Sequence, residues 1–128
     1  GILKRYEFVH EMPKQLASKL SKMGKNLSGG QRQRLSIARG ILKDRKILLL
    51  DDSFSALDYL TESKIRTELI SRKKHYITFL SSQRIASLLI ADKIVVLENG
   101  KQVGFDTHSN LLKNCMAYQE LCRSQGIE

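Results

Sequence analysis

The sequence predicts an α/β fold: a parallel-sheet core with flanking helices, followed by a C-terminal β-hairpin and further helices. Apolar runs at residues 47–50 and 76–80 have the length and composition of buried parallel strands. The segment between them, residues 59–72, has apolar positions at helical spacing and is expected to cover the sheet. Near the C-terminus, two β-branched segments flank Asn99-Gly100, a pair that readily forms the tight turn of a hairpin.

The length of the chain corresponds to one domain or part of one. The 128 residues are enough for a sizeable core, and 41% of them are hydrophobic. The net charge of +9 comes from basic residues spread along the chain, without interleaved aromatic residues, so nucleic acid is not an expected partner. No stretch reaches the roughly 18 apolar residues that a membrane-spanning helix needs.

The cysteines and histidines predict no metal site. Cys115 and Cys122 lie seven residues apart on an expected helix, so they share a face and are interpreted as small core residues. His10, His75 and His108 show no ligand spacing and are interpreted as structural. Two free thiols are typical of a reduced, cytosolic setting.

A hydroxyl and two glycines stand directly before an expected helix at residues 32–42. Ser28, Gly29 and Gly30 would place backbone amides and a rotatable donor at the positive end of the helix dipole. This arrangement favours a phosphate. The alternative is an ordinary serine cap with a glycine-containing turn.

Three motifs, in this order and spacing, resemble those of the ABC-type ATPases. They are Leu27-Ser28-Gly29-Gly30-Gln31 (signature), the strand ending in Asp51-Asp52 (Walker B) and Ser55-Ala56-Leu57-Asp58 (D-loop). The resemblance runs from about residue 7 to the C-terminus. It is closest to the nucleotide-binding domains of bacterial ABC exporters, particularly one subunit of heterodimeric multidrug types.

The resemblance implies a partial P-loop NTPase fold. Residues 1–43 correspond to the latter part of the helical subdomain with the signature. Residues 44–128 correspond to the C-terminal part of the ATPase core, with Walker B, D-loop, switch region and closing helices. No Gly-x-x-x-x-Gly-Lys-Ser/Thr run occurs, so the P-loop half lies outside this sequence. The chain alone is expected to bind ATP weakly or not at all, and to be inactive.

In the family, the signature serves ATP that is bound to the other subunit. Ser28 and Gly30 are expected to contact its γ-phosphate, with Gly29 allowing close approach and Gln31 lining the site. The D-loop residues Ser55 and Asp58 are expected at the same interface, although an N-capped helix start explains Asp58 equally well.

The remaining candidates belong to this chain's own ATP site. Asp51 is expected to hold Mg²⁺ through water, the alternative being a strand-end cap. Asp52 stands where the family's general base is normally glutamate, and Gln83 where a histidine contacts the γ-phosphate. The shorter carboxylate and the uncharged amide predict slow hydrolysis; alternatively, Gln83 is simply an exposed loop residue.

Asp52 and Gln83 both depart from the family pattern in one ATP site, whereas the signature is intact. This combination indicates the degenerate-site subunit of a heterodimeric exporter. Such a protein couples ATP and Mg²⁺ binding and hydrolysis to export. Its implied partners are a second ABC subunit and a transmembrane domain, and its place is the cytoplasmic face of the cell membrane. The family's Glu-Arg-Gly contact loop is replaced by Lys22-Met23-Gly24, which lacks the glutamate, so cross-talk through that loop is not expected.

Two other functions share these motifs: a soluble ABC-type ATPase acting on nucleic acid or ribosomes, and a regulatory subunit that binds ATP without turnover. The first usually has long insertions or a tandem domain. A parallel strand at residues 47–50 also needs neighbours on both sides, and an exposed edge would favour self-association of the chain.

Overall fold

A computed structural model describes residues 19–43, 45–72 and 76–127. The chain divides into two compact units, Gly1–Phe79 and Leu80–Glu128, and each is described by itself. The division expected from the resemblance, between residues 43 and 44, concerns family subdomains and stays a prediction. Residues 1–18 of the segment assigned to the helical subdomain lie outside the described residues.

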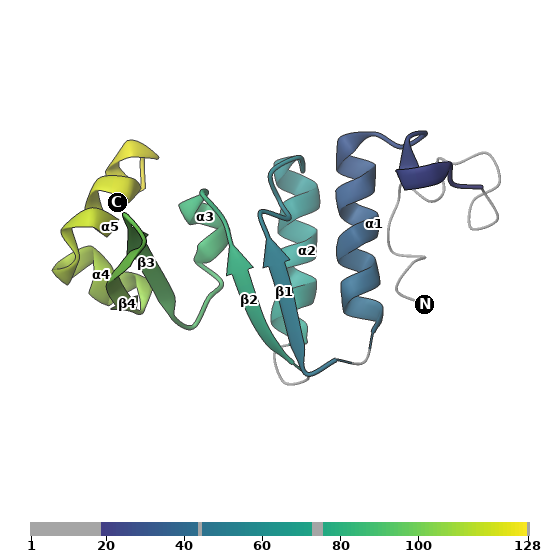
Figure 1. Cartoon of the computed structure of the whole chain (residues 1–128). Coiled ribbons are helices and arrows are strands. Elements are labelled where there is room, and N and C mark those ends of the chain that lie inside the picture. The colour runs from purple at the N-terminus through teal and green to yellow at the C-terminus, as the bar shows by residue number, and fades with distance from the viewer. Residues whose placement is uncertain (1–18, 44, 73–75, 128) are drawn as a thin grey trace. The chain divides into compact units, whose positions relative to one another are not determined.

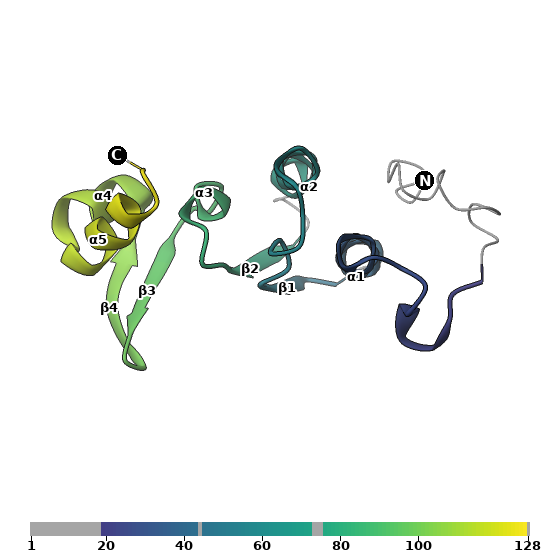
Figure 2. The same cartoon turned by 90° about the horizontal axis from the view of Figure 1, so that it is seen from above.

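The first unit is built around two paired parallel strands and two helices (Figure 1). Its elements are a short 3₁₀ turn (Lys22–Gly24), α1 (Gly29–Leu42), β1 (Ile47–Asp51), α2 (Tyr59–Ser71) and β2 (Ile77–Ser81), whose last residues belong to the second unit. At the start of the strand pair, the Ile77 N–H donates to the Lys46 carbonyl (2.8 Å). α2 lies over one face of the pair, and α1 packs beside β1 (Figure 2).

The core of this unit lies between the helices and one face of the strands. Ile37 and Ile41 share a face of α1 through their i,i+4 spacing, and both are buried. The other buried apolar side chains are Leu27, Ala38, Leu48, Leu50, Phe54, Leu57, Ile65 and Leu69.

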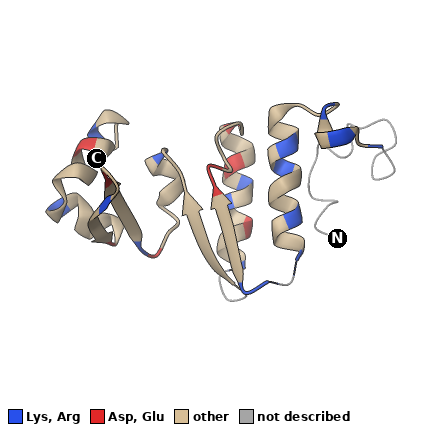
Figure 3. Cartoon of the chain, viewed as in Figure 1, with Lys and Arg blue, Asp and Glu red and all other residues tan. Residues whose placement is uncertain are grey.

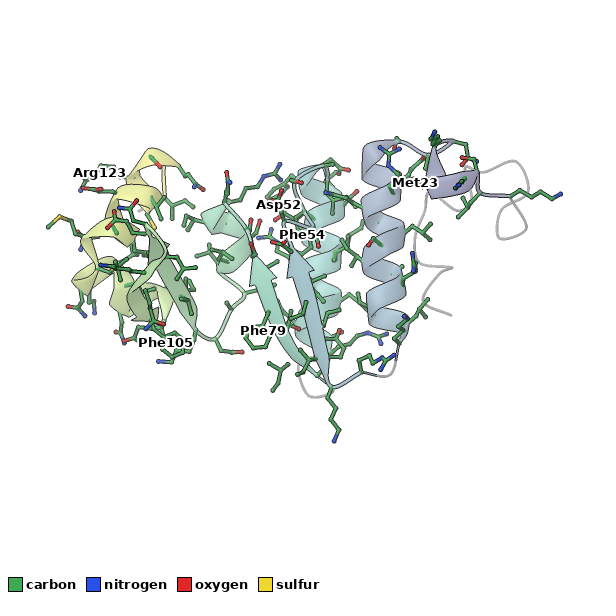
Figure 4. All side chains as sticks on the ribbon, viewed as in Figure 1. Met23, Asp52, Phe54, Phe79, Phe105 and Arg123 are labelled. Atoms are coloured by element: carbon green, nitrogen blue, oxygen red, sulfur yellow. The ribbon has the colours of Figure 1, made fainter. Side chains whose placement is uncertain are left out.

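The prediction that both strands are buried on both faces is wrong for this chain. β1 alternates: Leu48 and Leu50 are buried, whereas Leu49 is 71% exposed. On β2, Ile77 and Phe79 are exposed, and Figure 4 shows Phe79 on this strand. Successive strand side chains point to opposite faces, and the described helices cover only one of them. α2 likewise buries Ile65 and Leu69 but leaves Leu60 and Ile70 exposed.

The second unit is a hairpin with helices packed against it. Its elements are α3 (Ile85–Leu88), β3 (Ile94–Glu98), β4 (Lys101–Asp106), α4 (His108–Asn114) and α5 (Met116–Ser124). The hairpin prediction is confirmed: β3 and β4 are antiparallel, and the turn residues Asn99 (φ 49°) and Gly100 (φ 75°) are both left-handed. The register is irregular between Val96 and Leu97.

One apolar cluster holds this unit together. It comprises Ile85, Ile94, Val96, Leu111, Cys115, Tyr118 and Cys122. Both cysteines are free and buried, as predicted, but they do not share one helix, because Cys115 lies between α4 and α5. Burial raises the pKa of the Cys122 thiol, which keeps it protonated and unreactive.

His108 has the structural role expected of it. Its Nδ1 lies 2.9 Å from the Tyr118 hydroxyl, and the two rings meet edge to face. His10 and His75 lie outside the described residues. Among the residues that the structure describes, no helix has the length and apolarity to cross a bilayer.

Candidate functional site

The N-terminus of α1 is fixed by a reciprocal cap. Ser28 Oγ accepts the Gln31 N–H (3.1 Å), and Gln31 Oε1 accepts the Ser28 N–H (2.9 Å). The cap starts the helix at Gly29, three residues before the predicted start at Arg32. The serine cap is therefore present, and it leaves the predicted phosphate contact as a prediction. Because Oγ accepts in this cap, its own proton remains available to a ligand.

The next two amides are placed for an anion. The Arg32 N–H donates to the Ser28 carbonyl (2.9 Å), whereas the N–H groups of Gly29 and Gly30 have no partner within the described part of the chain. Ser28 and Gly29 are exposed. Basic side chains recur along α1 (Figure 3), and its N-terminus carries the positive end of the helix dipole. This helix end has the donors that a phosphate group requires.

The two predicted carboxylates lie at the carboxyl end of β1. Asp51 is the last residue of the strand, and Asp52 follows it with a left-handed backbone (φ 44°) (Figure 4). Both are exposed. The Asp52 carbonyl accepts the Ser55 N–H (3.4 Å) and the Ser55 hydroxyl (3.1 Å), which closes a tight turn. Exposed oxygens at the carboxyl end of a parallel strand suit a hard cation beside phosphates.

Asp58 caps the following helix. Its Oδ2 accepts the Thr61 N–H (2.9 Å), and its Oδ1 accepts the Thr61 hydroxyl (2.7 Å). These hydrogen bonds lower the pKa of Asp58, so the cap is anionic at neutral pH. The helix-cap interpretation of Asp58 is thus confirmed, while its place at a subunit interface stays a prediction.

Gln33 joins the helix to the loop, and the sequence analysis missed it. Its Oε1 accepts the Ala56 N–H (2.9 Å), and its Nε2 donates to Ser55 Oγ (3.0 Å) and reaches the Asp52 carbonyl (3.5 Å). A signal was present: Gln33 continues the buried stripe of Ile37 and Ile41 at i−4 spacing. A polar residue on an apolar stripe calls for a specific partner.

Gly30 brings the same two segments into close contact. A Cβ atom at this position would lie 3.0 Å from the Ala56 carbonyl oxygen. At Gly29, the nearest atom to such a Cβ would be the Ala56 Cβ, at 3.9 Å. The first turn of α1 and the loop at residues 52–56 therefore form one packed structure, which brings together the predicted residues Ser28 to Gln31 with Asp52 and Ser55.

Gln83 belongs to the second unit, where it is exposed in the loop before α3. Gln125, also missed from the sequence, holds this loop. Its Nε2 donates to the Gln83 carbonyl (2.7 Å), and its Oε1 accepts the Ile85 N–H (2.9 Å). The side chain of Gln83 is left at the surface, and its approach to Asp52 stays a prediction.

The described residues contain no group of three or more histidine, cysteine or acidic side chains that could hold a metal ion. Asp51 and Asp52 offer carboxylate oxygens only. This donor set fits Mg²⁺, which is commonly bound by one or two carboxylates together with water and substrate phosphates.

Comparison with known proteins shows what the chain resembles. Residues 2–55 match the ABC transporter family. The chain is 44% identical over 118 residues to a putative ABC transporter ATP-binding protein of Mycoplasma genitalium, covering 92% of this chain and 19% of that protein. It is 40% identical over 121 residues to an ATP-dependent lipid A-core flippase of Albidiferax ferrireducens, covering 94% and 21%.

The fold agrees with these relatives. The structure of a bacterial Atm1-family ABC exporter with ATP bound superposes with a TM-score of 0.90 at 31% identity, covering 99% of this chain and 22% of the exporter chain. Over nearly its whole length the chain is similar to ABC transporter ATP-binding proteins. It corresponds to part of an ABC exporter's nucleotide-binding domain, as its motifs predict.

The fold prediction, a partial ABC-type P-loop NTPase domain, is also confirmed. The chain spans about a fifth of the length of the relatives it matches.

Proposed function

We propose that this chain is the signature-bearing part of an exporter's ATP-binding subunit, and that it acts on ATP held by a second ABC subunit. Ser28, Gly29 and Gly30 would supply the hydroxyl and amide donors to the γ-phosphate, and Gln31 would line the site. The subunit would sit at the cytoplasmic face of the membrane and couple ATP hydrolysis to export through a transmembrane domain.

One observation supports this proposal above the others. At the start of α1, where Ser28 and Gly29 are exposed, there are hydrogen-bond donors that the helix cap does not use. The cap engages the Gln31 N–H through Ser28 Oγ. The Ser28 O–H and the amides of Gly29 and Gly30 then point toward the same helix end. A phosphate bound there needs no rearrangement of the helix, so the site is pre-organised.

The chain's own ATP site would use the loop after β1. ATP supplies the phosphoryl group transferred to water, and Mg²⁺ offsets its charge. Asp51 would hold the cation through water, and Asp52 would orient the attacking water and accept its proton. Gln83 would donate to a phosphate oxygen without carrying a charge. Because both Asp52 and Gln83 depart from the family pattern, this site would turn over slowly.

A heterodimer follows from this asymmetry, in which the chain lends an intact signature to the partner's competent site. The test is Ser28→Arg in the complete transporter with its partner subunit. A large side chain at the helix end blocks the phosphate, so steady-state ATP hydrolysis should fall at least tenfold, a loss of about 1.4 kcal/mol or more in transition-state stabilisation.

Ser36→Arg is the matched control, because Ser36 lies on the same helix and is exposed. It introduces the same charge and bulk two turns away and should leave hydrolysis unchanged. Equal activity in both variants would contradict the assignment of the signature to an ATP site.

A further inference from the structure

The side chain of Gln33 holds the loop at residues 52–56 by both ends of its amide. The carbonyl oxygen accepts the Ala56 N–H (2.9 Å), and the amide nitrogen donates to Ser55 Oγ (3.0 Å). A glutamine amide offers a donor and an acceptor in a fixed plane, so the two bonds set the orientation of the loop as well as its distance.

The loop has little freedom once it is held in this way. Ser55 Oγ accepts from Gln33 and donates to the Asp52 carbonyl (3.1 Å), so the side chain of Gln33 is linked through one hydroxyl to the backbone of Asp52. Hydrogen bonds in such a chain support one another. The position of the Asp52 carboxylate therefore depends on Gln33 indirectly, through Ser55.

The same face of α1 carries the contact at Gly30. Gly30 and Gln33 are three residues apart, so they lie on one side of the helix, and both meet Ala56. Ser28 precedes this turn and is fixed to it by the reciprocal cap. A movement of the loop thus cannot occur without moving the helix end that carries Ser28.

We propose that Gln33 is a positioning residue that locks the loop of Asp52, Ser55 and Ala56 to the phosphate-binding end of α1. This proposal rests on the function proposed above, in which Ser28 serves the partner's ATP and Asp52 serves this chain's own. Gln33 then makes the geometry of the two sites interdependent within one subunit, without contacting either nucleotide.

The test is Gln33→Leu in the complete transporter with its partner subunit. Leucine keeps the size of the side chain and removes both hydrogen bonds. We expect kcat for ATP hydrolysis to fall on the order of tenfold, since displacements of about 1 Å in a site can cost a hundredfold. KM for ATP should change less than twofold, because Gln33 is turned to the loop.

Gln119→Leu is the matched control. Gln119 also donates its amide to a backbone carbonyl, that of Leu112 (2.8 Å), but it lies in the second unit. It should leave kcat unchanged per folded molecule. Gln33→Glu should recover only part of the lost kcat, because a carboxylate still accepts the Ala56 N–H but cannot donate to Ser55 Oγ, whose own proton is donated to the Asp52 carbonyl.

A double-mutant cycle with Ser55→Ala tests the contact directly. Because the two residues share one hydrogen bond, the double variant should lose less than the product of the two single losses. Strictly multiplicative losses would overturn the proposal. So would a kcat for Gln33→Leu equal to that of Gln119→Leu while Ser28→Arg still abolishes turnover. Unchanged turnover in Ser28→Arg would instead overturn the proposed function.

Discussion

The contact between Gly30 and Ala56 predicts that two adjacent glycines differ in what they tolerate. A Cβ at Gly30 would lie 3.0 Å from the Ala56 carbonyl oxygen, so the loop or the helix must move by a few tenths of an ångström. A Cβ at Gly29 would make only an ordinary contact at 3.9 Å. Comparing the stabilities of Gly29→Ala and Gly30→Ala should therefore separate the effect of packing from the effect of helix propensity.

The magnitude follows from two opposing terms. Alanine gains at most about 1 kcal/mol over glycine in a helix, and somewhat less in a first turn. Overpacking costs roughly 1–3 kcal/mol when the neighbour is backbone that cannot rotate away. We expect Gly29→Ala to be neutral or slightly stabilising, and Gly30→Ala to be less stable than Gly29→Ala by about 1–3 kcal/mol.

The assay is urea unfolding of the complete nucleotide-binding domain without nucleotide, so that effects on ATP binding do not enter. The two variants share the same chemical change one residue apart, and each serves as the control for the other. Equal midpoints and slopes for Gly29→Ala and Gly30→Ala would refute the close packing of the first turn of α1 on the loop.

Three further predictions concern other contacts. The hydrogen bond from Lys93 (2.9 Å) lowers the pKa of Asp106 to about 2, below its ordinary value of 3.8. The ionised carboxylate therefore stabilises the fold above about pH 4, and this contribution is lost as the pH falls toward about 2. In Asp106→Asn, thermal unfolding should lose that part of its pH dependence, and an unchanged profile would contradict the pairing. Tyr118→Phe should lower the free energy of unfolding by about 1–2 kcal/mol, because the half-buried His108 Nδ1 loses its partner, whereas Tyr59→Phe at a 72% exposed site should have no effect in the same urea titration. Asp52→Glu combined with Gln83→His should raise single-turnover hydrolysis at the weak site of the complete transporter, and no gain would mean that other residues limit it.

The sequence predicts the local elements of this chain well, because their signals are local. Asn99-Gly100 forms the expected tight turn, and Asp58 caps the helix that follows it, as expected. The end of β1 at Asp51 is likewise where the apolar run stops. Each of these depends on residues within a few positions of one another.

The burial of a side chain is less predictable from the sequence, since it depends on which element covers that face of the strand or helix. Leu49 and Phe79 have the composition of core residues, yet both are exposed here. The apolar runs indicate strands that can be covered on both sides, and α1 and α2 cover one side only. The predicted self-association of the chain stays a prediction, and these exposed side chains give it a physical basis beyond the strand edge.

The candidate site shows the same division. The motif residues Ser28, Gly30 and Asp52 are visible in the sequence because their chemistry is distinctive. The roles of Gln33 and Gln125 are not visible in the sequence, because each depends on hydrogen bonds to distant residues. The partners lie 19 to 23 residues away for Gln33 and 40 to 42 for Gln125. The place of Gln33 on the apolar stripe of α1 predicts that its amide needs a partner, but no spacing pattern identifies which one.

The backbone conformation of Asp52 affects which residue type suits this position. From the sequence, aspartate in place of glutamate is a shorter base and predicts slow hydrolysis. In the structure this residue has a φ of 44°, a region in which aspartate and asparagine are enriched several-fold over other side chains. The tight turn closed by Ser55 therefore favours aspartate for a conformational reason independent of catalysis. Replacing it by glutamate lengthens the carboxylate but strains the turn, so the gain in hydrolysis has to be measured together with the stability of the same variant.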